Sequence, residues 1–226
     1  MPPHQPSDLS PHLPSTTPPT TAPTTAPTMP DLVVLSHLRW EWVWQRPQHI
    51  VSRIARQRAA AGARTWFVEE PVVGDVDHPQ IRTQPVDGLT RAWLVMPPAS
   101  SPTVRSEAHP MDRGFEDAGA RDLGPLLAAE LERAGRPSAP DVWLYTPMAL
   151  DVARSLAPGR LIYDVMDDLA SFKNPPQGLM LRQRRLLADA DVVFTGGPSL
   201  HRGITRQRGE GVHLFRSGVE TGHYAA

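Results

Sequence analysis

The sequence predicts an α/β fold, in which helices cover both faces of a mainly parallel sheet. Short apolar runs without polar alternation, such as residues 31–35 and 142–145, indicate strands that are buried on both faces. From Asp31 onward these runs alternate with segments whose apolar residues recur at helical spacing. Together these observations predict one Rossmann-like, doubly wound parallel sheet spanning residues 31–220.

The first unit of this fold comprises a strand, a long loop and a helix. Residues 31–35 read as the strand, and residues 36–45 form a loop rich in polar and aromatic side chains. Pro47 suits the first turn of a helix, because its missing N–H would have no partner there. A strand, loop and helix at the front of an α/β chain is where such folds bind ligands, beyond the carboxyl end of the strand.

The remaining elements follow from the same patterns. Further strands are predicted at 64–68, 89–96, 142–145, 161–165, 191–195 and 212–215, and helices at 123–134, 147–156, 179–190 and near Ser199. Residues 72–90, apart from the start of the strand at Leu89, are predicted to be irregular, and residues 99–120 show no clear pattern.

Composition excludes several classes of function. The formal net charge of −1 offers no general attraction to nucleic acid or to an anionic membrane. The absence of cysteine excludes disulfides and thiolate metal sites, and it is compatible with a reducing cytoplasm. No run approaches the roughly 20 apolar residues of a membrane span.

Residues 1–30 differ from the rest of the chain. They include ten prolines and repeats such as TTAPTTAPT, with few large apolar side chains. Such a segment buries too little surface to offset its ordering entropy, so we expect a disordered tail. It lacks the basic start and apolar core of a signal peptide. The tail is either a docking segment or the product of a mis-called start codon.

The loop after the first strand supplies candidate ligand-binding side chains. Aromatic faces and fork-shaped donors suit ligands rich in hydroxyl groups. A cation at the start of a helix has no favourable interaction with the helix dipole, so Arg46 predicts an anionic partner, either a ligand phosphate or Glu41 or Glu69. His37 is either a base or ligand contact, or only a loop side chain. The candidates are His37, Arg39, Trp40, Gln45, Arg46 and His49.

Three carboxylates follow the strand at 161–165. Asp164, Asp167 and Asp168 lie within five positions, where one of them could accept a proton from a hydroxyl or bind a sugar. The alternative is that Asp167 or Asp168 caps the next turn. Their spacing is not the Asp-x-Asp pattern of a metal-dependent transferase, and we predict no metal and no cofactor.

Two turns rich in small residues complete the candidate site. Gly196 and Gly197 would let a backbone approach a phosphate at the start of the following helix, and Ser217-Gly218 follows the last strand. The pattern is not GxGxxG, which argues against an NAD site. Read alone, Gly-Gly-Pro needs no ligand.

Four segments resemble one enzyme family: SHLRWEWVWQRPQHI (36–50), IYDVMDDLASF (162–172), ADADVVFTGGPSL (188–200) and VHLFRSGVETGHY (212–224). They are similar to the N-terminal half of bacterial family-4-like glycosyltransferases of the two-domain GT-B fold, some of which occur beside sugar-nucleotide mutases. The QRPQH run is the most specific part. In the last segment, Ser217 stands where the family usually has Asn, and Glu220 where it usually has Asp.

The resemblance implies transfer of a sugar from a nucleotide-sugar donor to a glycan or lipid-linked acceptor in cell-envelope synthesis. Residues 36–49 would bind the acceptor, Asp164 to Asp168 would line the cleft, and Gly196, Gly197, Ser217 and Gly218 would contact the nucleotide-sugar or its phosphate. Residues 221–226 would begin the linker to a second domain that this chain lacks, so the enzyme would need that domain in cis or in trans.

Location and rival functions follow from the same reading. We expect a cytoplasmic protein without a transmembrane segment, with contact to the inner face of the membrane left open, and no nucleic-acid partner. One rival is a non-catalytic carbohydrate- or nucleotide-binding module, or a truncated remnant of the enzyme. A phosphatase or hydrolase is disfavoured, because the chain has no cysteine and no GxSxG motif.

Overall fold

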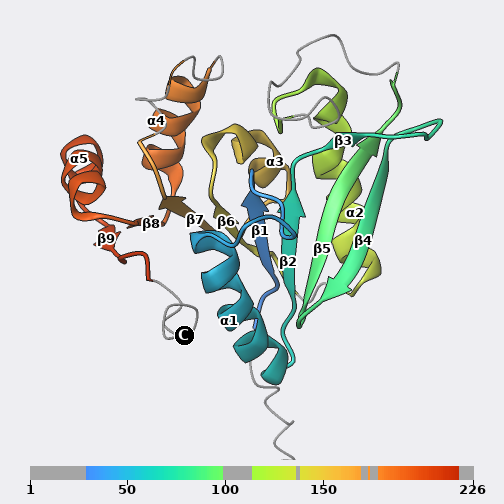
Figure 1. Cartoon of the computed structure of the whole chain (residues 1–226), viewed down its shortest axis with the longest axis horizontal. Helices are drawn as coiled ribbons and strands as arrows, with labels where there is room; N and C mark the ends of the chain where they lie inside the picture. The colour runs from blue at the N-terminus through green and yellow to red at the C-terminus, as the bar shows by residue number, and fades with distance from the viewer. Residues whose placement is uncertain (1–28, 99–113, 136–137, 169–172, 174–177, 219–226) are drawn as a thin grey trace, which may run out of the picture.

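A computed structural model describes residues 29–98, 114–135, 138–168, 173 and 178–218 (Figure 1). The predicted tail therefore lies outside the described residues, except for Met29 and Pro30. The predicted linker at 221–226 lies outside them altogether.

A nine-stranded sheet forms the centre of the described structure. Its strand order is β3-β5-β2-β1-β6-β7-β8-β9, with β4 paired to β5. Every pairing is parallel except that of β4 with β5. The strands are β1 (Leu32–Ser36), β2 (Thr65–Glu69), β3 (Val72–Val73), β4 (Gln80–Val86), β5 (Leu89–Met96), β6 (Asp141–Leu144), β7 (Arg160–Val165), β8 (Val192–Thr195) and β9 (Val212–Leu214).

Helices cover both faces of this sheet, as the doubly wound prediction requires. Helix α1 (Arg46–Ala60) packs Val51 and Ala55 on the face that carries Val34 and Phe67. The opposite face, which carries Val33 and Leu35, packs against α2 (Leu123–Arg133), α3 (Leu150–Ser155), α4 (Leu179–Asp189) and α5 (Pro198–Arg208). Figure 1 shows α1 in front of the strands and α2 behind β4 and β5. Short 3₁₀ turns precede α2 at Ala118–Asp122 and α3 at Pro147–Ala149.

The prediction of irregular structure over residues 72–90 is wrong. The segment contains β3 and β4, and β4 forms an antiparallel hairpin with β5. Asp87 and Gly88 join the two strands with φ of 43° and 84°, as a two-residue turn with positive φ at both positions requires. Pro85 is tolerated because β4 pairs only with β5, so one side of its backbone needs no hydrogen bond.

The strand order reverses between β1 and β6. Strand β1 pairs with β2 on one side and with β6 on the other, so the chain leaves the centre of the sheet in both directions. In doubly wound sheets the loops on either side of such a switch point diverge and leave a crevice at the carboxyl ends of the strands. The fold thus directs attention to the residues that follow β1, β6, β7 and β8.

Candidate functional site

Loops from four neighbouring strands contribute to what we call the switch-point site. We define it by His37 after β1, Arg46 at the start of α1, Tyr145 after β6, Asp164 near the end of β7 and Gly196 after β8. These residues are distant in sequence, and the parallel sheet brings them to one edge.

Arg46 and Asp164 form a buried ion pair at the centre of this site. The Arg46 Nε atom lies 3.1 Å from both Oδ1 and Oδ2 of Asp164, and the two side chains are 4% and 0% exposed. The anionic partner predicted for Arg46 is therefore present, but among protein side chains it is Asp164 rather than Glu41 or Glu69. This pairing assigns Asp164 to holding the guanidinium in place.

The pKa values in this pair reflect burial. Desolvation raises the pKa of the Asp164 carboxyl above its ordinary value of 3.8, while the Arg46 charge, the Arg46 hydrogen bond and the adjacent Tyr145 hydroxyl act in the opposite direction. Burial also raises the pKa of Tyr145 well above 10, so its phenol stays neutral. Tyr145 is a site residue that the sequence patterns did not single out, because it reads as the last residue of an apolar strand.

Several buried polar atoms of this site have no hydrogen-bond partner among the described residues. They are Nη1 and Nη2 of Arg46 and Nδ1 of His37, whereas the Tyr145 hydroxyl lies close enough to Asp164 to stabilise that carboxylate by a hydrogen bond. A buried unsatisfied group costs about 1–3 kcal/mol. Such atoms also occur elsewhere, for example at Thr65 and Gln183. At the switch point, however, three such atoms lie between the end of β1 and the start of α1, which is the arrangement expected where a ligand completes the bonding.

His37 is held as a neutral imidazole. Burial lowers its pKa below the ordinary 6.5, and the charge of Asp167 opposes that shift. At neutral pH its Nδ1 therefore offers either a lone pair or an N–H group, depending on the tautomer. Both possibilities suit a sugar hydroxyl.

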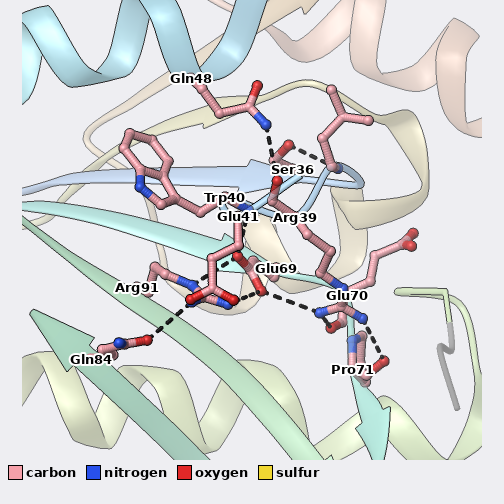
Figure 2. Close-up of polar contacts among 11 residues, drawn as sticks. Ser36, Arg39, Trp40, Glu41, Gln48, Glu69, Glu70, Pro71, Gln84 and Arg91 are labelled. Atoms are coloured by element: carbon pink, nitrogen blue, oxygen red, sulfur yellow. Dashed lines mark hydrogen bonds and ion pairs between the residues drawn. The ribbon is translucent and has the colours of Figure 1, made fainter. Parts of the chain in front are cut away.

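The loop that follows His37 is fixed by a buried carboxylate, as Figure 2 shows. Oε1 of Glu69 accepts the Trp40 backbone N–H at 2.7 Å and Arg91 Nε at 3.0 Å. Its Oε2 accepts Arg91 Nη2 at 3.1 Å and Arg39 Nη1 at 3.4 Å. Glu69 thus ties the loop after β1 to the end of β2 and to β5.

Two residues predicted to bind an acceptor have structural contacts in this network. Arg39 is 8% exposed and also donates to the carbonyl oxygens of Glu70 and Pro71. Trp40 is 3% exposed and packs edge-on against Phe67 at 5.0 Å. Both side chains serve the loop's architecture, so neither presents a free surface to a ligand.

The other predicted loop residues surround an exposed tip. The side chains of Trp42, Val43 and Trp44 are 48%, 83% and 38% exposed. The Trp44 ring lies 5.4 Å from the ring of His49 and 5.5 Å from that of Trp40. Gln45 forms the N-cap of α1 and exchanges hydrogen bonds with Gln48, which limits its side chain to a local role.

The predicted carboxylate cluster is divided by burial. Asp164 is fully buried, whereas Asp167 and Asp168 are exposed. The three carboxylates therefore lie in different environments. Asp167 is the member whose charge reaches His37.

The small-residue turns meet Arg46. A Cβ added to Gly196 would lie 3.8 Å from Arg46 Cδ and 3.3 Å from Ser217 Oγ. The Ser217 N–H donates to the Gly196 carbonyl at 3.2 Å. Gly197 is the N-cap of α5. Gly218 is exposed and has no neighbour within 4 Å of an added Cβ.

No family model matches the chain, and no curated protein matches it. Several solved structures do match this chain. A trehalose-6-phosphate structure from E. coli bound with UDP-2-fluoro glucose is 14% identical, with a TM-score of 0.50 over 86% of this chain and 50% of that one. The trehalose-6-phosphate synthase OtsA is 13% identical, with a TM-score of 0.46 over 86% and 51%. The α,α-trehalose 6-phosphate synthase from Burkholderia multivorans is 17% identical, with a TM-score of 0.44 over 79% and 43%.

The first of these likenesses shows the fold. This chain has the Rossmann-like α/β architecture found in one half of GT-B glycosyltransferases, as predicted. It spans about half the length of the solved structures that it matches. None of the helices in the described ranges combines the length and apolar character needed to cross a bilayer.

Proposed function

We propose that this chain is the acceptor-side half of a GT-B glycosyltransferase. The reaction is transfer of a sugar from a nucleotide-sugar to a glycan or lipid-linked acceptor in the synthesis of a cell-envelope polysaccharide. The observation that carries this proposal is the group of unpartnered polar atoms at the switch point of a GT-B-like half. The four quoted segments that resemble the family-4-like group support it.

Each site residue has a distinct task in this proposal. The neutral imidazole of His37 hydrogen-bonds an acceptor hydroxyl, and the exposed faces of Trp42 and Trp44 offer a platform for a sugar ring. Asp164 positions Arg46, whose free nitrogens face the ligand. Gly196 allows the chain to approach without a side chain. The second domain, in cis or in trans, supplies the rest of the donor site.

The alternative is a carbohydrate- or nucleotide-binding module without catalysis. Such a module would bind its ligand at the same edge of the sheet, with the same residues of the switch-point site. It is compatible with the unpartnered polar atoms at the switch point, which would bind a sugar whether or not a reaction follows.

Binding by the full chain tests the part that both functions share. Nucleotide-sugars and neutral oligosaccharides are titrated by isothermal calorimetry against wild type, His37→Ala and Trp42→Ala. We expect each variant to weaken glycan binding by about fivefold or more, because each removes one direct contact. Matched controls at exposed positions, His78→Ala and Met180→Ala, should leave it unchanged.

Transfer separates the two functions. The chain is added to a membrane extract of its source with a labelled nucleotide-sugar, and labelled glycan is measured. An increase in labelled glycan with the wild-type chain, but not with His37→Ala, supports the transferase. Glycan binding without an increase in labelled glycan supports the binding module. If the chain binds no sugar, both proposed functions are wrong.

A further inference from the structure

The Arg46 guanidinium has an unused pair of donors. Its Nε is bound by Asp164, while Nη1 and Nη2 are buried and find no acceptor among the described residues. The side chain is 4% exposed, so these nitrogens do not face bulk solvent. The two Nη groups of a guanidinium match the spacing of two oxygens of a phosphate or carboxylate. Asp164 thus fixes the guanidinium through one nitrogen and leaves the other two for an anion.

The start of α5 lies at the same place. Gly197 caps this 11-residue helix without a side chain, and no acidic residue occupies its first turn. The free N–H groups and the positive end of the helix dipole are therefore not compensated by the helix itself. A Cβ added to Gly196, one residue earlier, would lie 3.8 Å from Arg46 Cδ. The start of α5 and the Arg46 guanidinium are independent features, and both favour an anionic ligand.

The Phe215 ring covers this position. The centre of its ring lies 5.4 Å from Arg46 Cζ, although the side chain is 56% exposed. The backbone of Phe215 is tied to β8, because its N–H donates to the Thr195 carbonyl at 3.0 Å. A rotation of the Phe215 side chain can therefore uncover the guanidinium without a change in the backbone.

We propose that Arg46 Nη1 and Nη2, together with the start of α5, bind a phosphoryl oxyanion of the substrate, which displaces the Phe215 ring. The anion site stands on these contacts. The identity of the phosphate's carrier rests on the proposed function, and it is either a sugar phosphate acceptor or the nucleoside diphosphate of the donor.

Phosphate binding by the full chain tests this site. Inorganic phosphate, a hexose phosphate and UDP are each titrated by ³¹P NMR and calorimetry. We expect Arg46→Lys to weaken phosphate binding by about tenfold, because an ammonium keeps the charge but lacks the paired donors. Phe215→Ala should tighten it severalfold by removing the cover. Arg185→Lys, on the exposed side of α4, is the matched control and should change nothing.

Three results would overturn the site: no phosphate binding by wild type, unchanged binding by folded Arg46→Lys, or unchanged or weaker binding by Phe215→Ala. Because Phe215 is exposed, the Phe215→Ala variant still tests the site if Arg46→Lys does not fold.

Tighter binding of the hexose phosphate than of UDP assigns the phosphate to the acceptor, and the reverse order assigns it to the donor. Arg46-dependent binding of phosphate without preference for any sugar or nucleotide keeps the site and counts against the proposed function. Nucleotide-sugar binding that is unchanged in Arg46→Lys would count against the anion site and support the proposed function.

Discussion

Glu69 is the residue on which the shape of the candidate site most depends. Its carboxylate is 1% exposed and receives hydrogen bonds from Arg39, Arg91 and the Trp40 backbone. Removing one partner of a buried ion pair leaves the other charges unpaired, which costs more than the pair itself contributes.

We therefore expect Glu69→Ala to lower the free energy of unfolding by about 3–5 kcal/mol. Glu41→Ala is the control, because Glu41 also pairs with Arg91 but its side chain is 66% exposed, and it should cost no more than about 1 kcal/mol. Urea denaturation measures both. Equal costs for the two variants would show that the buried network contributes no more than the surface pair.

The pH dependence of His37 is a second prediction at this scale. Burial lowers its folded-state pKa below 6.5, so the unfolded chain takes up the proton at higher pH than the folded one. The free energy of unfolding should fall as the pH drops from about 6.5 toward that lowered pKa. His37→Gln should lack this component. Titration of the imidazole by NMR gives the pKa directly, and Asp167→Asn should lower it further because the Asp167 charge opposes the shift. A His37 pKa at or above 6.5 would contradict the prediction.

Sequence patterns located these residues better than they assigned their roles. They placed His37 and Asp164 near the ends of strands and Arg46 at the start of a helix, where the structure has them. They could not show that Arg46 pairs with Asp164, because the contact depends on which strands become neighbours. Nor could they show that Trp40 is buried while Trp42 is exposed, since the loop has no period that fixes side-chain direction.

At the scale of elements, the contact between α2 and α3 requires a residue without a side chain. A Cβ on Gly124 would lie 2.0 Å from Ser155 Oγ and 2.9 Å from Ser155 Cβ. The helices cannot both keep their positions if Gly124 is enlarged.

Gly124→Ala should therefore destabilise the protein by about 1–3 kcal/mol, despite the higher helix propensity of alanine. Adding Ser155→Ala should recover part of the loss, because it removes the nearer atom. The control is Gly203→Ala within α5, where nothing lies within 4 Å of the added Cβ, and there we expect a gain of about 0.5–1 kcal/mol. Thermal and urea unfolding measure all three. Effects of the same sign at both glycines would refute the packing argument.

The hairpin of β4 and β5 shows why β4 was missed. Asp87-Gly88 is a strong hairpin signal, but Arg82, Gln84 and Pro85 obscure the alternation of β4. An edge strand with one solvated side needs few apolar residues, so hydrophobic patterns identify it poorly.

At the scale of the whole molecule, the alternation of strands and helices sufficed to predict the fold class. That alternation did not give the strand order, and the reversal beside β1 is seen only in the structure. The pairing of β4 depends on tertiary packing that no local sequence pattern encodes. The same holds for the uneven cover, in which the described residues place one helix on one face and four on the other.

The N-terminal segment provides a prediction at this scale. Residues 1–28 have the composition of a chain that cannot form a core, and the described fold begins with a contact from Arg58 to the Pro30 carbonyl. A protein that starts at Met29 should therefore unfold at the same temperature as the full chain and bind the same ligands. Differential scanning calorimetry and the phosphate titration check this. A lower melting temperature would show that the segment contributes to the fold.

The central position of β1 also has a consequence for biosynthesis. One edge of β1 hydrogen-bonds to β2, which is synthesised soon after it. The other edge pairs with β6, where Leu32 lies opposite Asp141, and β6 is synthesised much later. A ribosome makes the intervening chain first, so a nascent protein carries an apolar strand with an open edge throughout that interval. Chaperone contact should be greatest in that window of translation and should end once residues 141–144 have left the exit tunnel.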